Sequence, residues 1–221
     1  SSIHNLKSLR DSNGKIKMDV LLESFSKLKN FINPASKIEV VISANNQNYD
    51  KETTTKTGLE NLDVLNGVDL QSEEIAWITG SDVNFCAQAF PTVGYDHPDA
   101  PILTVLGAVL RNGFLHSAIR EKGGAYGSGA QQDSASRSFR FFSYRDPNCK
   151  ETFSAFNESI EWSLKSINSE KLEEGILGII SSIDKPGSPA GEARADFNQN
   201  IRGIDQSKRK IFRRRVINCS V

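Results

Sequence analysis

Residues 115–130 read LHSAIREKGGAYGSGA, and within this stretch the pattern of the chain changes from helical to extended. The helical part ends in Arg120, Glu121 and Lys122, and small residues then follow, interrupted only by Tyr126. Gly123 and Gly124 allow the backbone to turn sharply after a helix, with a positive φ if the turn needs one. A linker has no need of this tyrosine, and a core strand has no need of these glycines. The stretch therefore predicts a helix, a tight turn and a strand, in that order.

The flanking segments extend this pattern in both directions. Residues 102–111 are almost wholly apolar, with Thr104 and the final Arg111 as exceptions, which predicts a helix buried on most sides. Gly113 permits a bend before 114–121 continues the helix. Residues 138–144 read SFRFFSY and predict a strand. The interleaving of helices and strands indicates an α/β or α+β fold with helices mainly on one face of a sheet. Other expected elements are a helix over 18–32, a strand over 37–43, one or two strands over 75–89 broken near Gly80, and helices over 153–167, 172–183 and beyond 189.

The composition limits the classes of partner. Lys plus Arg (27) equals Asp plus Glu (27), so the net charge of the 221 residues gives no electrostatic basis for binding nucleic acid or an anionic membrane. We interpret the basic run over 208–215 as a solvated helix face in preference to a phosphate-binding patch. No apolar run is expected to reach membrane-spanning length. Cys86, Cys149 and Cys219 are scattered and indicate reduced thiols, with Cys86 a small core residue.

Several kinds of catalytic site lack their motif in this sequence. The histidines His4, His97 and His116 form no HxxEH or other ligand pair, so we expect no metal site in this chain. The GxSxG motif of serine hydrolases is missing, and the glycines lack the lysine of a phosphate loop.

Arg120 and Tyr126 remain as candidates. Arginine offers a charged fork for carbonyl or carboxylate oxygens, and a tyrosine O–H can donate to a developing oxyanion. The alternative is a Schellman-type helix end with a packed tyrosine. His116 lies four residues before Arg120 and could share its helix face, or could be an ordinary, partly exposed helix residue.

Three segments carry a resemblance to a known family: HPDAPILTVLGAVLRNGFLHSAIREKGGAYGSGA (97–130), FRFFSYRDP (139–147) and SIDKPGSPAGEA (182–193). Together they resemble the C-terminal part of presequence-protease-type zinc metallopeptidases, in the clan of pitrilysin and insulin-degrading enzyme. The resemblance runs from about Trp77 to the end. It implies a mixed, largely antiparallel sheet with helices mainly on one face. Residues 1–36 would be a helical lead-in, and 37–221 a metallopeptidase-like C-terminal domain that is truncated at its C-terminal end.

The resemblance also implies a function. Proteins of this kind enclose unfolded peptides between two halves, and the N-terminal half holds zinc and a glutamate base on an inverted HxxEH motif. The C-terminal half supplies an arginine and a tyrosine from an R-x-x-G-x-A-Y turn, which match Arg120 and Tyr126. Gly123 and Gly124 would then belong to the substrate-binding turn.

We therefore expect a non-zinc-binding portion of a zinc endopeptidase that degrades short unstructured peptides, inactive on its own. Its partners would be the peptide and the N-terminal catalytic half of the same polypeptide. The alternatives are an inactive chamber-forming or peptide-binding subunit of the clan, and an unrelated domain of fortuitous likeness. We expect a cytoplasmic location, or an organelle matrix if the parent gene is eukaryotic.

Overall fold

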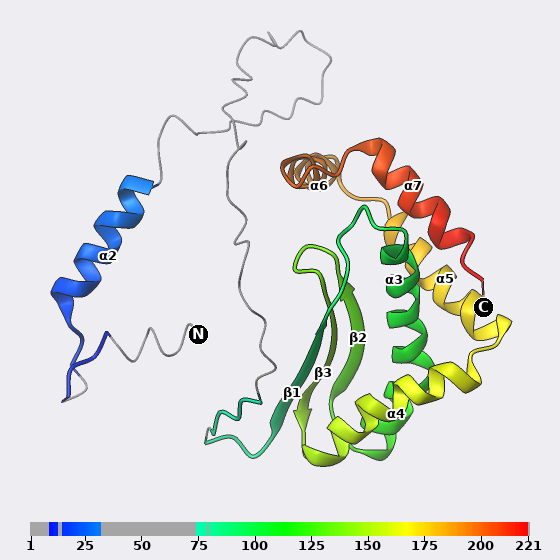
Figure 1. Ribbon diagram of the computed structural model, residues 1–221, viewed down its shortest axis with the longest axis horizontal. Helices are drawn as coiled ribbons and strands as arrows, with labels where there is room; N and C mark the ends of the chain where they lie inside the picture. Colours follow the sequence, from blue (N-terminus) through cyan, green and yellow to red (C-terminus); the bar gives the residue numbers. More distant parts are fainter. Residues whose placement is uncertain (1–8, 13–14, 32–73, 79, 221) are drawn as a thin grey trace, which may run out of the picture. The chain divides into compact units, whose positions relative to one another are not determined.

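The computed structural model describes residues 9–12, 15–31, 74–78 and 80–220 (Figure 1). The chain divides into two units, Ser1–Glu73 and Glu74–Val221, which are described separately. The first contains helix α2, Met18–Phe31, which confirms the helical periodicity of that segment. The strand expected over 37–43 and the boundary expected between residues 36 and 37 lie outside the described residues and stay predictions.

The second unit is built around a three-stranded antiparallel sheet in the order β1-β3-β2. The strands are β1 (Asn84–Pro91), β2 (Gly127–Asp133) and β3 (Ser138–Asp146), and β3 pairs with both of the others. The segment 75–89 was expected to give one or two strands. The structure has one, which begins after Gly80 and runs on to Pro91, and it leaves 75–78 outside the sheet.

A long helix follows β1 and packs against the sheet. Helix α3 (Asp99–Leu110) continues without interruption into a π-helical segment, η3 (Arg111–Lys122). The helix thus continues through Gly113, where the sequence permits a bend. A side chain at Gly113 would collide with the indole of Trp162, so this glycine serves a close contact between η3 and a later helix.

The length of this continuous helix corrects one expectation. The helix Asp99–Lys122 has 24 residues and contains an 18-residue stretch with a mean hydropathy of 1.4, so by length and composition it is long and apolar enough to cross a membrane. No apolar run of that length was expected from the sequence. Val105, Val109, Leu110, Leu115 and Ile119 of this helix are all buried within the protein, as in the core helix of a globular domain.

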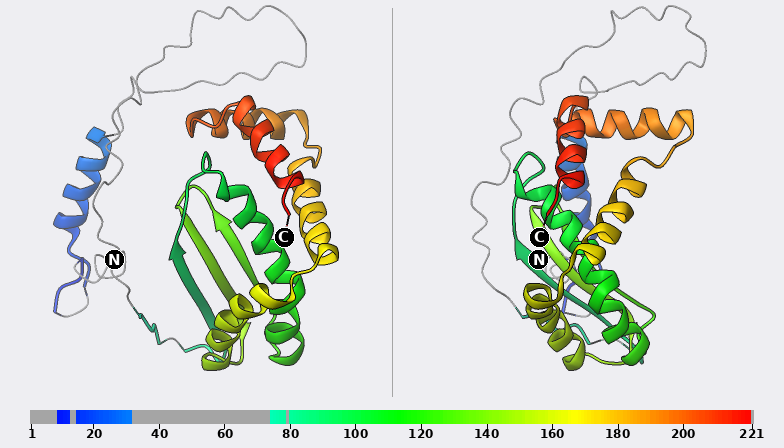
Figure 2. Two further views of the ribbon diagram at one scale, coloured as in Figure 1. Left: turned by 45° about the vertical axis from the view of Figure 1, so that its right-hand side comes forward. Right: turned by 90° about the vertical axis from the view of Figure 1, so that its right-hand side faces the viewer.

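The first core lies between the sheet and the helices on one of its faces (Figures 1 and 2). Phe141 of the central strand is 1% exposed and its ring centroid lies 5.5 Å from that of Phe156 in helix α4 (Lys150–Ser166). Phe139 packs edge-on against Phe141 at 5.4 Å. Cys86 is buried in the same cluster, which confirms it as a small core residue.

Three C-terminal helices follow: α5 (Ser169–Ile183), α6 (Pro189–Ile201) and α7 (Gln206–Ile217). The second core lies on the other side of α3, against α5 and α7. Val105 and Val109 of α3 pack with Val216 of α7. A Cβ at Gly175 would lie 2.6 Å from Val109 Cγ2, so the missing side chain lets α5 approach α3 closely. The prediction that α3 is buried on most sides is confirmed in part, because Ile102 is 48% exposed and Leu106 is only half-buried.

The basic run of α7 joins this helix to its neighbours. Lys208 Nζ lies 2.9 Å from Asp96 Oδ2, and the guanidinium groups of Arg209 and Arg213 pair with Asp196 and Asp184. The pairing with Arg213 lowers the pKa of Asp184, mainly through its side-chain hydrogen bonds. Part of the run is therefore engaged in ion pairs on the protein surface, which agrees with a solvated helix face.

Candidate functional site

The turn between η3 and β2 has a backbone that only glycine fits well. Gly124 has φ +78°, in the left-handed region that residues with a side chain rarely adopt. Its N–H donates to Arg120 O at 3.0 Å, and Ala125 N–H donates to Ile119 O at 3.1 Å, so the last carbonyls of the helix are satisfied. A Cβ at Gly123 would lie 2.6 Å from Ile119 O. The helix thus ends at a left-handed glycine, with the hydrogen bond from Gly124 to Arg120 that defines an αL cap in place of the Schellman pattern of the alternative interpretation.

Tyr126, which follows this turn, is not packed into the described part of the protein. Its side chain is 62% exposed. Its backbone N–H donates to Arg145 O at 3.2 Å, and its ring centroid lies 5.6 Å from that of Tyr144. The guanidinium carbon of Arg145 lies 5.4 Å from the centre of the Tyr126 ring, within cation–π range. Tyr126 is therefore fixed at its backbone and contacted at its ring, while much of its side chain stays accessible.

Arg120 is exposed on the last turn of η3. Its Nη1 lies 3.2 Å from His116 Nε2, and His116 Nδ1 lies 3.5 Å from Glu121 Oε1. The prediction that His116 and Arg120 share a helix face is confirmed. In the described part of the chain, Arg120 and Tyr126 have separate sets of contacts, although both flank the same turn.

The turn is braced by the segments around it. Asn148, just after β3, donates its side-chain N–H to Gly123 O at 2.6 Å. Ser128 in β2 donates its hydroxyl to Leu115 O at 3.2 Å, which joins the strand to the helix before the turn. These bonds fix the direction in which the chain leaves the helix and so the place of Tyr126.

The Tyr144 ring, which Tyr126 contacts, lies on the sheet face opposite the helices. On this face the rings of Tyr144 and Phe142 cover Gly127 and Gly129 of β2, so closely that a Cβ at either glycine would collide with them. Phe85 of β1 pairs with Tyr144 and is 70% exposed. The glycines of β2 thus make room for aromatic side chains of the neighbouring strand.

Sequence reasoning missed Tyr144 and Arg145 as members of this site. A signal was present in the period-two alternation of the strand, because an alternation that places Phe139, Phe141 and Ser143 on the buried face would place Arg145 there next. A buried, unpaired arginine is costly, so the pattern indicated an irregularity in the strand at that position.

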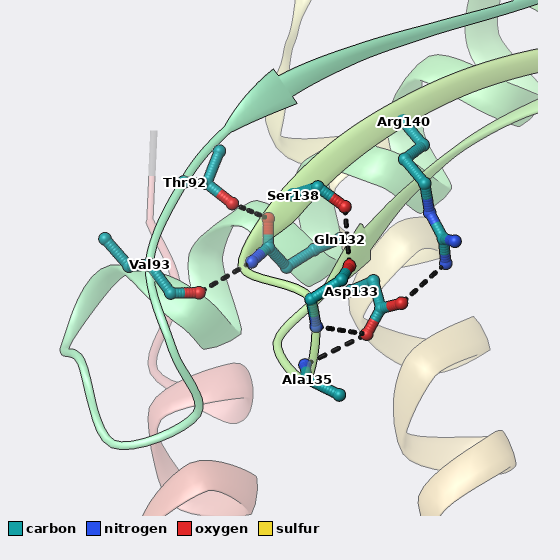
Figure 3. A network of polar contacts seen from close by, with 8 residues as sticks. Thr92, Val93, Gln132, Asp133, Ala135, Ser138 and Arg140 are labelled. Carbon is teal, nitrogen blue, oxygen red and sulfur yellow. Dashed lines mark hydrogen bonds and ion pairs between the residues drawn. The ribbon is translucent and has the colours of Figure 1, made fainter. Parts of the chain in front are cut away.

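A polar network closes the opposite end of the sheet (Figure 3). The buried side chain of Gln132 accepts from Thr92 Oγ1 at 2.9 Å and donates to Val93 O at 3.0 Å. Asp133 accepts from Ala135 N at 2.9 Å and pairs with Arg140 at 2.9 Å. Burial opposes ionisation of Asp133, but its hydrogen bonds and the nearby Arg140 charge outweigh burial and lower its pKa. These contacts satisfy the hairpin turn, so we assign the network a structural role.

No group of three or more His, Cys, Asp or Glu side chains that could hold a metal ion is found in the part of the chain that the structure describes.

Comparison with known proteins gives consistent matches over most of this unit. A family model described as the PreP C-terminal domain matches residues 79–221. The chain is 36% identical over 136 residues to "Presequence protease, mitochondrial" from Danio rerio, a match that covers 61% of this chain and 13% of that protein. A protein of the same name from Yarrowia lipolytica is 38% identical over 140 residues, covering 63% of this chain and 14% of the relative. A crystal structure of pitrilysin aligns over 62% of this chain and 15% of its own, with 19% identity and a TM-score of 0.48. The chain thus spans a small part of the length of these curated relatives.

Proposed function

The chain belongs to the PreP C-terminal domain family, and on this basis we propose that it forms part of the C-terminal half of a zinc endopeptidase. The substrates would be short unstructured peptides, enclosed between this half and the N-terminal catalytic half of the same polypeptide. The names of the relatives, which call them presequence proteases, support a protease as the whole protein.

One observation carries the proposal for the site: Tyr126 is an exposed aromatic residue on a rigid, hydrogen-bonded turn. Hydrolysis of a peptide bond turns the carbonyl oxygen into an oxyanion, and a donor that is already in place stabilises that charge. Tyr126 would donate its phenolic hydrogen to this oxyanion. Arg120 would donate to backbone carbonyl oxygens of the peptide through its planar guanidinium group. Gly123 and Gly124 would serve the site by forming the turn that presents both side chains.

Zinc would be bound by the N-terminal half of the polypeptide, as the resemblance implies.

An organelle matrix is the location we propose, in place of the cytoplasm. The scattered cysteines indicated a reducing compartment, and a reducing organelle matrix satisfies the same observation. The names of the relatives from Danio rerio, Yarrowia lipolytica and Drosophila melanogaster include the word "mitochondrial".

The decisive experiment is Tyr126→Phe in the intact protein, assayed with an unstructured peptide. We expect kcat and kcat/KM to fall together by about 10²–10³-fold, because the donor acts only in the transition state. Arg120→Lys should act partly through KM, since it contacts peptide backbone in the ground state as well.

A matched control is Tyr95→Phe, which removes the hydroxyl of a tyrosine that stacks on Phe212 at 4.6 Å. Its turnover should stay at the wild-type value. If Tyr126→Phe lowers the melting temperature while its folded fraction keeps normal turnover, the tyrosine has only a structural role. If the intact wild-type protein binds peptide and cleaves none, it is the inactive subunit of the alternative hypothesis.

A further inference from the structure

The middle strand of the sheet carries one extra residue beside Tyr126. From Pro91↔Ser138 to Phe85↔Tyr144, β1 and β3 pair residue by residue, and the next pair is Asn84↔Asp146. Arg145 is therefore skipped by β1. On its other side its carbonyl accepts the N–H of Tyr126 at 3.2 Å. Arg145 is the inserted residue of a β-bulge, a feature that often redirects a side chain next to an active site.

The bulge changes where the arginine side chain lies. Phe141 and Ser143 face the helices, and Tyr144 lies on the open face, so regular alternation would direct Arg145 into the core. The extra residue removes that requirement. Arg145 is exposed, with its guanidinium over the Tyr126 ring, and Asp146 after it is buried again.

Arginine is an unusual residue for the backbone conformation at position 145. Arg145 has φ +48°, in the left-handed region, where glycine or asparagine would be less strained. Strain of this kind persists only where surrounding contacts enforce it, and it is concentrated at functional sites. A glycine would make the bulge easily, but it would leave the Tyr126 ring without its cationic neighbour. The bulge therefore explains the left-handed backbone at this position, but it does not explain why the residue there is an arginine.

We propose that Arg145 is a positioning residue for Tyr126: its guanidinium, together with the Tyr144 ring, holds the Tyr126 ring in the orientation from which the hydroxyl meets the substrate. This inference rests on the proposed function of Tyr126. It assigns Arg145 no contact with the peptide itself.

The test is Arg145→Gly in the intact protein, because glycine accepts the left-handed backbone and leaves the bulge in place. We expect kcat to fall by about 2- to 30-fold, the range that corresponds to loss of one cation–π contact. KM should change by less than about twofold, since substrate binding is not its role. Added to Tyr126→Phe, the same change should cause no further loss, because the hydroxyl it positions is gone.

A second measurement follows the ring directly. With 3-fluorotyrosine incorporated, the fluorine NMR signal of Tyr126, assigned by its loss in Tyr126→Phe, should sharpen and shift toward that of a free tyrosine in Arg145→Gly. The matched control is Arg137→Gly, at the other left-handed arginine of the described chain (φ 52°), in the β2–β3 turn. It relieves the same kind of strain and should change neither kcat nor the Tyr126 signal. Both variants should melt within about 3 °C of wild type.

The outcomes separate the two ideas. Normal turnover in Tyr126→Phe refutes the proposed function, and with it the kinetic role of Arg145. Lost turnover in Tyr126→Phe, with an unchanged fluorine signal and normal kcat in Arg145→Gly, refutes only the inference about Arg145. Losses that multiply in the double variant would show that Arg145 acts on the substrate itself and would overturn its assignment as a positioning residue.

Discussion

Replacement of Gly124 by alanine tests whether the turn before Tyr126 is fixed by backbone conformation. Gly124 has φ +78°, and the nearest atom to an added Cβ would be Pro147 Cγ at 3.6 Å, an ordinary contact. Space is therefore available, and only the left-handed conformation opposes the substitution. That conformation costs an alanine about 1–2 kcal/mol. Gly124→Asn should recover part of the loss, because asparagine tolerates this region better.

Two other glycines serve as controls for this comparison. At Gly123 a Cβ would lie 2.6 Å from Ile119 O, a backbone atom, so Gly123→Ala should cost about 1–3 kcal/mol through overpacking, and asparagine should be no better. Gly178 is helical, and an added Cβ there would meet nothing within 4 Å. Gly178→Ala should therefore stabilise the protein by about 0.5–1 kcal/mol.

The free energy of unfolding can be measured by urea titration followed by circular dichroism, with the slope of each transition compared to confirm two-state behaviour. The expected order of stability is Gly178→Ala, wild type, then Gly124→Asn, with Gly124→Ala below it. If Gly124→Ala is as stable as wild type, or if asparagine is no better than alanine at 124, the left-handed turn is not the reason for this glycine. Near the melting temperature, each kcal/mol corresponds to roughly 2–4 °C for a unit of this size.

Two further predictions concern the core and the hairpin end of the sheet. Phe156→Ala should lower the free energy of unfolding by about 3–5 kcal/mol, because its ring is fully buried against Phe141. Leu164→Ala in the same helix should change it by less than about 0.5 kcal/mol, since Leu164 is 77% exposed. Both are read from denaturant midpoints, and equal effects would contradict the placement of α4. The pKa of Asp133 is lowered in the folded state. The ionised carboxylate therefore stabilises the fold fully above the unfolded pKa of about 3.9, and this stabilisation is lost as the pH falls through the lower folded pKa. The stability difference between wild type and Asp133→Asn should therefore be constant above about pH 5 and shrink on acidification; a difference that grows with acid would contradict it.

Local signals in the sequence were sufficient for the order of elements around the turn. The apolar run of α3, the glycine pair and the aromatic run of β3 each determine a conformation over a few residues, and all three predictions are confirmed. The sequence did not show which face of β1 is buried. Both parities of the segment are apolar, and the structure buries Cys86 while Phe85 and Ala87 are exposed. Only packing against the helices selects between the two, and that information is not local.

The same limit applies to the long helix. The glycine at position 113 makes room for Trp162, which is far away in the sequence, so its reason could not be read from the residues around it. Leu106 cannot be distinguished from Val105 by hydropathy, yet one is half-buried and the other is 1% exposed. For the candidate site, the motif indicated Arg120 and Tyr126, whereas the left-handed conformation of Arg145 depends on its pairing with two other strands.

Tyr126 lies between two residues with left-handed backbone. The energies of ordering and burying its side chain suggest that it does not serve the stability of the fold. Gly124 precedes it in a left-handed conformation, and Arg145, also left-handed, accepts its backbone N–H. A tyrosine that is 62% exposed gains little from burial, so ordering its ring costs entropy that the hydrophobic effect does not repay. An arginine at a bulge adds strain that glycine would avoid. Gly127 and Gly129 have a simpler explanation. Aromatic rings of the neighbouring strand occupy the space where their side chains would lie, so packing alone requires glycine there. Packing accounts for those glycines but not for an exposed tyrosine beside a left-handed arginine, and the proposed donor role of Tyr126 would supply the missing reason.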